Sequence, residues 1–189
     1  MNKQKGFTLI ELLVVIAIVA VLSVVVILTL NPAELLKQAR DSNRVSDLST
    51  IKSAVSLYLA DGQTSWTSSN TVCYATTSSA PTRCGGYFGA TFVTTSTGSA
   101  TTTNTNGTGW VPVNFAAISS GAPFSLLPKD PINNGTYFYG FAATSTYNAF
   151  KLAANMESIR YSNGGSGDVE TTDGGTVTTV YETGSMLTL

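Results

Sequence analysis

Apolar residues are concentrated in one uninterrupted stretch near the N-terminus. Between Phe7 and Leu30 the only charged side chain is Glu11, and Leu12–Leu30 contains none. As a helix rising about 1.5 Å per residue, this stretch would measure roughly 36 Å. A hydrocarbon core of about 30 Å needs about 20 such residues. The pattern therefore predicts a transmembrane helix over residues 7–30.

The residues on either side of this stretch give its expected orientation. Lys3 and Lys5 precede it, and basic residues favour the cytoplasmic side of a membrane. An ordinary secretory signal would have a shorter apolar core, of about 7–15 residues, followed by a cleavage site of small residues. Residues 28–32 offer no such site. We therefore expect a single-pass anchor with a cytoplasmic N-terminus and everything after Leu30 outside the membrane.

A second, amphipathic helix is expected within residues 31–62. Asn31-Pro32 is consistent either with the start of this helix or with a kink in one long helix. An apolar stripe recurs at helical spacing and should dock on a sheet: Leu48, Ile51, Val55 and Tyr58. Most of the opposite face is charged, and we interpret it as solvated rather than as subunit-pairing charges: Lys37, Arg40, Asp41, Arg44, Asp47 and Lys52.

The remainder of the chain predicts a Thr/Ser-rich variable region over 63–122 and a β region over 123–189. Within the first of these segments, the hydroxyl-rich composition of residues 63–109 predicts a small contribution to the core, and order is expected to return near Trp110. Strand patterns cover 136–143 and 147–156, and a third strand is expected at 176–181. In the second pattern Lys151 falls on the face opposite Phe150 and Leu152. The order predicts an α+β fold with a long helix on a small antiparallel sheet.

Composition excludes several classes of function. The chain has no histidine, which removes the commonest general base and metal ligand. The net charge of −1 argues against nucleic acid as a partner. A Ser-His-Asp site is impossible, and no phosphate-binding glycine loop with lysine is present, so we do not expect an enzyme.

Two features of the exported part concern its stabilisation. Cys73 and Cys84 are the two cysteines, and outside the membrane they are expected to form a disulfide. No cofactor is expected, although Asp168, Glu170 and Asp173 could offer oxygen ligands to calcium. The alternative for these three acids is a solvated acidic loop.

Glu11 has no basic residue in the apolar span to pair with, and such a carboxylate indicates a function. The segment Lys5-Gly6-Phe7-Thr8-Leu9-Ile10-Glu11, followed at once by the apolar run, resembles the cleavage and methylation motif of type IV pilins and type II secretion pseudopilins. The resemblance implies a leader over 1–6, cleavage between Gly6 and Phe7 by a prepilin peptidase, and N-methylation of Phe7. It also implies that Glu11 meets a Phe7 amine in a filament.

The C-terminal part carries a second resemblance. Residues 127–131 (LPKDP), an aromatic strand and then 152–157 (LAANME) are similar to the Asp-Pro loop and following hairpin of pilin-like domains. Some major pseudopilins bind calcium in a late loop. The resemblance therefore gives a reason to consider Asp168, Glu170 and Asp173 as calcium ligands.

We therefore expect a pilin-like filament subunit, first in the membrane and then in an extracellular or periplasmic filament. Its expected partners are other copies of itself and related pilins, the prepilin peptidase and the inner-membrane assembly platform. Pilus and secretion pseudopilus both remain open. The alternative is a minor or non-polymerising pilin-like surface or adhesion protein on the same anchor.

Overall fold

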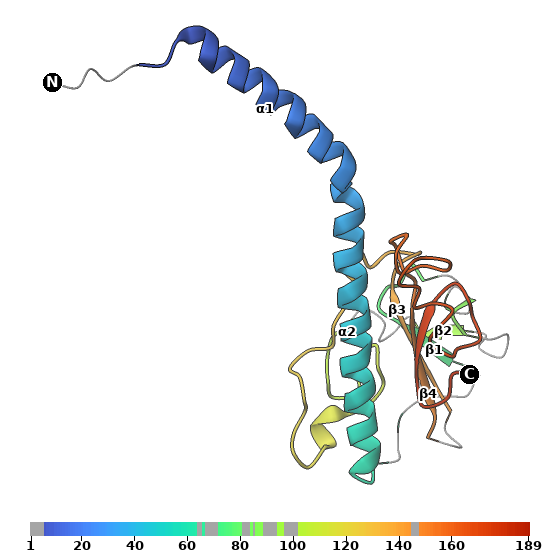
Figure 1. Cartoon of the computed structure of the whole chain (residues 1–189). Coiled ribbons are helices and arrows are strands. Elements are labelled where there is room, and N and C mark those ends of the chain that lie inside the picture. Colours follow the sequence, from blue (N-terminus) through green and yellow to red (C-terminus); the bar gives the residue numbers. More distant parts are fainter. Residues whose placement is uncertain are drawn as a thin grey trace. The chain divides into compact units, whose positions relative to one another are not determined.

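The computed structural model describes residues 6–63, 66, 72–80, 84, 86–88, 94–96, 102–144 and 148–189. The chain divides into two compact units, Met1–Leu36 and Lys37–Leu189. The described part contains two long helices followed by a five-stranded sheet (Figure 1).

The first helix, α1, covers Leu9–Leu30. The second, α2, covers Pro32–Ala60, and Asn31 separates them. The Asn31 backbone is left-handed, with φ 39° and ψ 74°, a conformation that asparagine tolerates better than most residues. The Asn31 carbonyl and side-chain oxygens both accept the Glu34 N–H, at 3.0 and 3.4 Å. Of the two alternatives, the start of a new helix is therefore the one observed, with proline at its first position.

The sheet has the strand order β2-β1-β3-β4-β5. Strands β1, β3, β4 and β5 pair antiparallel, and β2 pairs parallel with β1 at the edge. The strands cover Val72–Ala75 (β1), Thr94–Ser96 (β2), Tyr139–Ala143 (β3), Phe150–Ala154 (β4) and Tyr181–Gly184 (β5). The expected α+β plan with an antiparallel sheet is thus confirmed, and the parallel edge strand is an addition to it.

The third expected strand was placed too early in the chain. Residues 176–180 form turns, and β5 begins only at Tyr181. Two carboxylates hold these turns by accepting backbone N–H groups. Asp173 accepts the N–H of Gly175 at 2.7 Å, and Glu182 accepts the N–H of Val177 at 2.9 Å. These backbone groups therefore bond to side chains, and not to a neighbouring strand as they would in a sheet.

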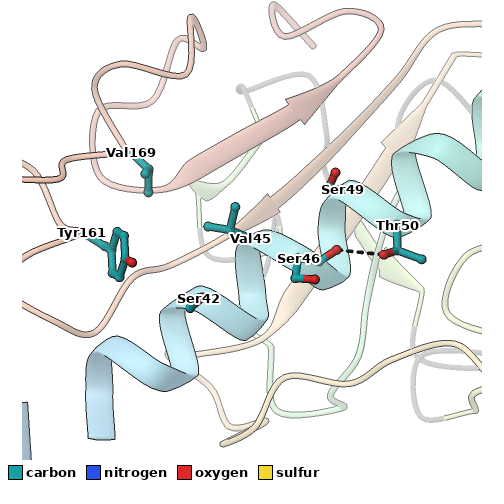
Figure 2. Close-up of a pocket in the computed structure, with 7 residues that line it drawn as sticks. All are labelled: Ser42, Val45, Ser46, Ser49, Thr50, Tyr161 and Val169. Carbon is teal, nitrogen blue, oxygen red and sulfur yellow. Dashed lines mark hydrogen bonds between the residues drawn. The ribbon is translucent and has the colours of Figure 1, made fainter. Parts of the chain in front are cut away.

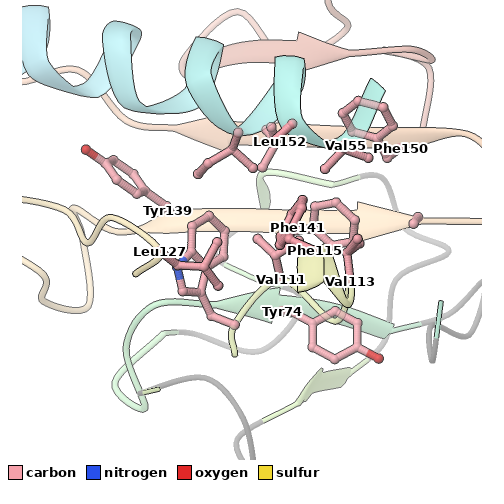
Figure 3. Close-up of a cluster of buried hydrophobic side chains, with 14 of the residues drawn as sticks. Val55, Tyr74, Val111, Val113, Phe115, Leu127, Tyr139, Phe141, Phe150 and Leu152 are labelled. Carbon is pink, nitrogen blue, oxygen red and sulfur yellow. The ribbon is translucent and has the colours of Figure 1, made fainter. Parts of the chain in front are cut away.

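One face of the sheet packs on the apolar stripe of α2, as expected. All four predicted stripe residues are buried. Figure 3 shows Val55 beside Phe150 and Leu152, and shows Tyr139 and Phe141 in the same cluster. This cluster forms the larger hydrophobic core.

The segment from Trp110 onward, where order was expected to return, contributes large side chains to this core. Trp110 and Phe115 are fully buried, the latter in the short 3-10 helix η2, which covers Phe115–Ala117. The Trp110 indole N–H donates to the Pro128 carbonyl at 3.0 Å. A few large side chains supply this buried surface.

The other face of the sheet carries a second core that the sequence analysis did not foresee. It contains Cys73, Phe88, Phe138, Ala142, Ala153 and Val180. Lys151 lies on this face and is fully buried, so the alternation along β4 was predicted correctly but its polar face is not solvated. The C-terminal residues cover that face, since Val177 and Leu189 pack against it.

Candidate processing and assembly site

The predicted cleavage point lies in an exposed segment before α1. Gly6 and Phe7 are both exposed, Phe7 to 89%. A Cβ added at Gly6 would meet no atom within 4 Å. The peptide bond between these residues is therefore open to an approaching peptidase, and glycine leaves it sterically unhindered.

Glu11 lies in the first turn of α1 and caps the helix together with Thr8. The Thr8 N–H and hydroxyl each donate to Oε2 of Glu11 at 2.8 Å, and the Glu11 N–H donates back to the Thr8 hydroxyl at 3.3 Å. This reciprocal pair is a capping box. Its atoms all lie after the Gly6–Phe7 bond, so it persists when residues 1–6 are removed.

Sequence reasoning missed the role of Thr8. Glu11 was expected to find its partner only outside its own segment, whereas the structure supplies a local one. The signal was present as threonine three residues before a glutamate at the start of an apolar run. Both hydrogen bonds end on Oε2, and no hydrogen bond from the described residues ends on Oε1.

A shallow hollow of about 360 Å³ adjoins this carboxylate. Its lining is apolar apart from the glutamate: Phe7, Ile10, Glu11, Val14 and Val15. The rest of α1 is also uncovered, because none of the stretch Leu9–Ile27 is buried. Among the described residues this is the one helix long and apolar enough to cross a membrane, and it fits a single-pass anchor.

A buried ion cluster joins the start of the second unit to its loops. Arg44 of α2 donates to both oxygens of Asp130, at 2.6 and 3.0 Å, and to Asp41 at 2.6 Å. All three side chains are fully shielded from solvent. Burial by itself lowers the pKa of Arg44, but the hydrogen bonds and charges of Asp130 and Asp41 outweigh it and raise that pKa above its usual value. The expectation that these helix charges are solvated was wrong for Asp41 and Arg44.

Asp41 and Arg40 extend the cluster to the loop after β4. The carboxylate of Asp41 accepts the N–H groups of Glu157 and Ser158, the shortest at 2.7 Å. Arg40 forms an ion pair with Glu157 at 2.6 Å. The cluster thus fixes α2 to two separate loops of the domain.

An open groove of about 420 Å³ runs beside α2. Figure 2 shows its lining, with Tyr161 and Val169 facing the helix from the C-terminal loops. The helix contributes small side chains, Ser42, Val45, Ser46, Ser49 and Thr50, and the Thr50 hydroxyl donates to the Ser46 carbonyl at 2.9 Å. The lining residues that the structure describes are hydroxylated or apolar, which suits a packing surface.

Cys73 of β1 and Cys84 form a disulfide, with their Cα atoms 6.3 Å apart. Both residues are fully buried in the second core. The bridge connects the sheet to the start of the segment that leads to β2.

Each of the three candidate calcium ligands accepts backbone N–H groups of the turns around it. Asp168 accepts the Thr171 hydroxyl and the Gly164 N–H, which lower the pKa of its carboxyl to about 2. Burial raises the pKa of Glu170 and of Asp173, although each accepts backbone N–H groups. Across the part of the chain that the structure describes, no three His, Cys, Asp or Glu side chains are grouped as a metal site.

Residues 1–27 match the family model described as the prokaryotic N-terminal methylation motif. This match confirms that the N-terminus carries the type IV pilin and pseudopilin signature. The motif is structural and does not describe an enzyme. Comparisons with curated proteins and with solved structures give no match.

Proposed function

We propose that this chain is the structural subunit of a type IV pilus or a type II secretion pseudopilus. Cleavage after Gly6, methylation of the Phe7 amine and polymerisation through α1 are the steps of its maturation. The observation that carries the proposal is the conjunction of the methylation motif with an apolar helix of which none of the stretch Leu9–Ile27 is buried by the described residues. Such a helix needs either lipid or other apolar helices around it.

Before assembly, lipid covers α1. In this proposal Lys3 and Lys5 hold the N-terminus in the cytoplasm, where the prepilin peptidase reaches the exposed Gly6–Phe7 bond. Cleavage creates a positive amine on Phe7, which the enzyme methylates. The assembly platform then moves the mature chain into a filament with other copies and related pilins, and the domain after Leu30 lies outside the membrane.

Within the filament, Glu11 receives the Phe7 amine of a neighbouring subunit. The capping box occupies Oε2, and no hydrogen bond from the described residues ends on Oε1, which can therefore receive a cation, while the adjoining hollow accommodates an apolar side chain. Opposite charges about 4 Å apart attract by about 4 kcal/mol at an effective dielectric near 20, before desolvation is subtracted. Each added subunit gains this attraction, so it favours the filament over the membrane pool.

The test replaces Glu11 with Ala and compares sheared surface fractions by electron microscopy. Membrane insertion and cleavage should persist, because the substitution removes a polar group and leaves Gly6 in place. Filaments should be lost, because removing one partner of a buried pair costs about 3–5 kcal/mol. Glu34→Ala, a carboxylate removed from the first turn of α2, is the matched control and should leave filaments intact.

Normal filaments of processed Glu11→Ala subunits would contradict the charge pairing. If the wild-type chain is cleaved but forms no filament and stays in the membrane, the protein is instead an anchored surface protein of the pilin-like type. The two outcomes are distinct, because the second appears without any substitution.

A further inference from the structure

The second core contains a pair of ionisable side chains that take no part in the proposed cleavage, methylation or assembly. Lys151 of β4 is fully buried, and Glu182 of β5 is 1% exposed. Lys151 pairs in register with Gly184, so Glu182, two residues earlier on β5, lies diagonally across from it on the same face. The ammonium Nζ of Lys151 contacts Oε1 of Glu182 in an ion pair.

Their surroundings are apolar. Nζ of Lys151 lies 5.6 Å from the centre of the Phe88 ring and donates to the Leu189 carbonyl at 3.0 Å. Oε2 of Glu182 accepts the Val177 N–H at 2.9 Å, and among the described residues the Lys151 ammonium is the one partner of Oε1. Two charges enclosed in this way carry a desolvation penalty that their attraction repays only with ideal, fully hydrogen-bonded geometry.

The backbone around the pair is shaped to enclose it. A Cβ at Gly175 would collide with the carboxyl group of Glu182, and a Cβ at Gly184 would collide with Phe150 and Lys151 backbone atoms. Glycine at these positions lets the 173–177 turn close over the carboxylate and lets β5 approach β4. The amine and the carboxyl are thereby held against each other on two paired strands.

A second carboxyl group adjoins the pair. Asp173 accepts the Glu182 N–H at 2.5 Å and the Gly175 N–H at 2.7 Å. Burial is the main cause that raises the pKa of Asp173, and its charge interacts with those of both Glu182 and Lys151. A carboxyl group in contact with the reacting residue can accept a proton and pass it on.

We propose that Lys151 and Glu182 condense to an intramolecular isopeptide bond that staples β4 to β5. A proton first passes from the ammonium to the carboxylate, which gives a neutral amine and a neutral acid. Nζ then attacks Cδ, a C–N bond forms and a C–O bond breaks. The amine loses one proton, relayed by Asp173 to the departing hydroxyl, and one water molecule is released.

The enclosure favours this reaction over a lasting ion pair. Well-oriented intramolecular groups react as though present at about 10⁵–10⁸ M. Condensation also removes two buried charges and leaves a neutral amide. No oxidant, metal or second protein is required.

The direct test is the intact mass of the full-length, detergent-solubilised protein. Relative to its sequence with the disulfide oxidised, the folded chain should be lighter by the mass of one water molecule. A mass without this loss means that the pair is an ion pair only and overturns the proposal.

Peptide mapping gives the location of the loss. Asp-Gly sites such as Asp61-Gly62 can also lose water by cyclising, so total mass alone does not identify the bond. With the isopeptide, trypsin cannot cut after Lys151, and residues 130–160 and 161–189 should appear as one branched species. Linear peptides ending at Lys151 in a chain that has lost water would equally overturn the proposal.

Variants separate the bond from general stability. Lys151→Met should restore the full mass, whereas Lys129→Met, which changes an exposed lysine, should retain the water loss. Asp173→Asn should fold and carry mostly unreacted chain, and complete water loss in that variant would contradict the relay. If Lys151→Met does not fold, the wild-type mass still decides the matter.

Discussion

The guanidinium of Arg44 donates to both oxygens of the Asp130 carboxylate, 86 residues further along the chain, and both side chains are shielded from solvent. Asp130 also accepts the Ile132 and Asn133 N–H groups, at 2.8 and 3.1 Å. The loop that follows Leu127 is therefore shaped around a charge supplied by α2. This contact fixes the middle of α2 on the domain, while the apolar stripe fixes the part that follows it.

Arg44→Met should destabilise the domain by about 3–5 kcal/mol, because it leaves the Asp41 and Asp130 carboxylates buried without their cation. Urea unfolding of the detergent-solubilised chain, followed by tryptophan fluorescence, measures the change. Lys52→Met, on an exposed position of the same helix, should stay within about 0.5 kcal/mol of wild type.

A double-mutant cycle sharpens this test. Arg44→Met combined with Asp130→Asn should cost less than the sum of the two single changes, because the second removes a charge that the first has stranded. Strict additivity would show that the two side chains do not interact in solution.

The Cys73–Cys84 bridge should stabilise the exported domain by about 3 kcal/mol on the chain-entropy model for a loop of this size. Unfolding midpoints measured with and without reductant give the value. Replacing both cysteines by Ala should reproduce the reduced midpoint. Two free thiols in alkylated native protein would disprove the bridge.

Acid should loosen the loop around Asp168. Hydrogen bonds from Thr171 and Gly164 lower the pKa of its carboxyl to about 2 in the folded chain, against about 3.9 when unfolded. A depressed pKa contributes stability that is present above the unfolded value and disappears as the pH falls through the folded one. The protection of the Gly164 and Thr171 amides against exchange, corrected for the intrinsic rate at each pH, should therefore fall between about pH 4 and pH 2, and Asp168→Asn should abolish that change.

Much of the N-terminal segment could be predicted from sequence because its structure depends on local information. A long apolar run has to be a helix in lipid, whatever follows it. The apolar stripe of α2 was equally predictable from the sequence, since its spacing is a property of the helix itself. The capping role of Thr8 was also encoded locally, and it was overlooked only because Glu11 was interpreted as lacking a partner.

The positions whose burial the sequence did not predict share a physical cause. A charged helix face has the same sequence pattern whether it is exposed to water or paired with a distant carboxylate. Asp130 is too far along the chain for the sequence to assign it to Arg44. Lys151 likewise follows the alternation of a half-exposed strand, and residues far from it in the sequence, among them Phe88 and Leu189, cover this face and bury it. Long-range burial therefore decided these positions.

The central claim is that the chain matures by cleavage after Gly6 and becomes a filament subunit. The most direct measurement is mass spectrometry of filaments sheared from cells with an active prepilin peptidase, combined with their imaging by electron microscopy. We predict filaments whose main component is this chain, beginning at Phe7 with one added methyl group on its amine. A chain that retains residues 1–6, or filaments that lack it while it remains in the membrane fraction, would contradict the account.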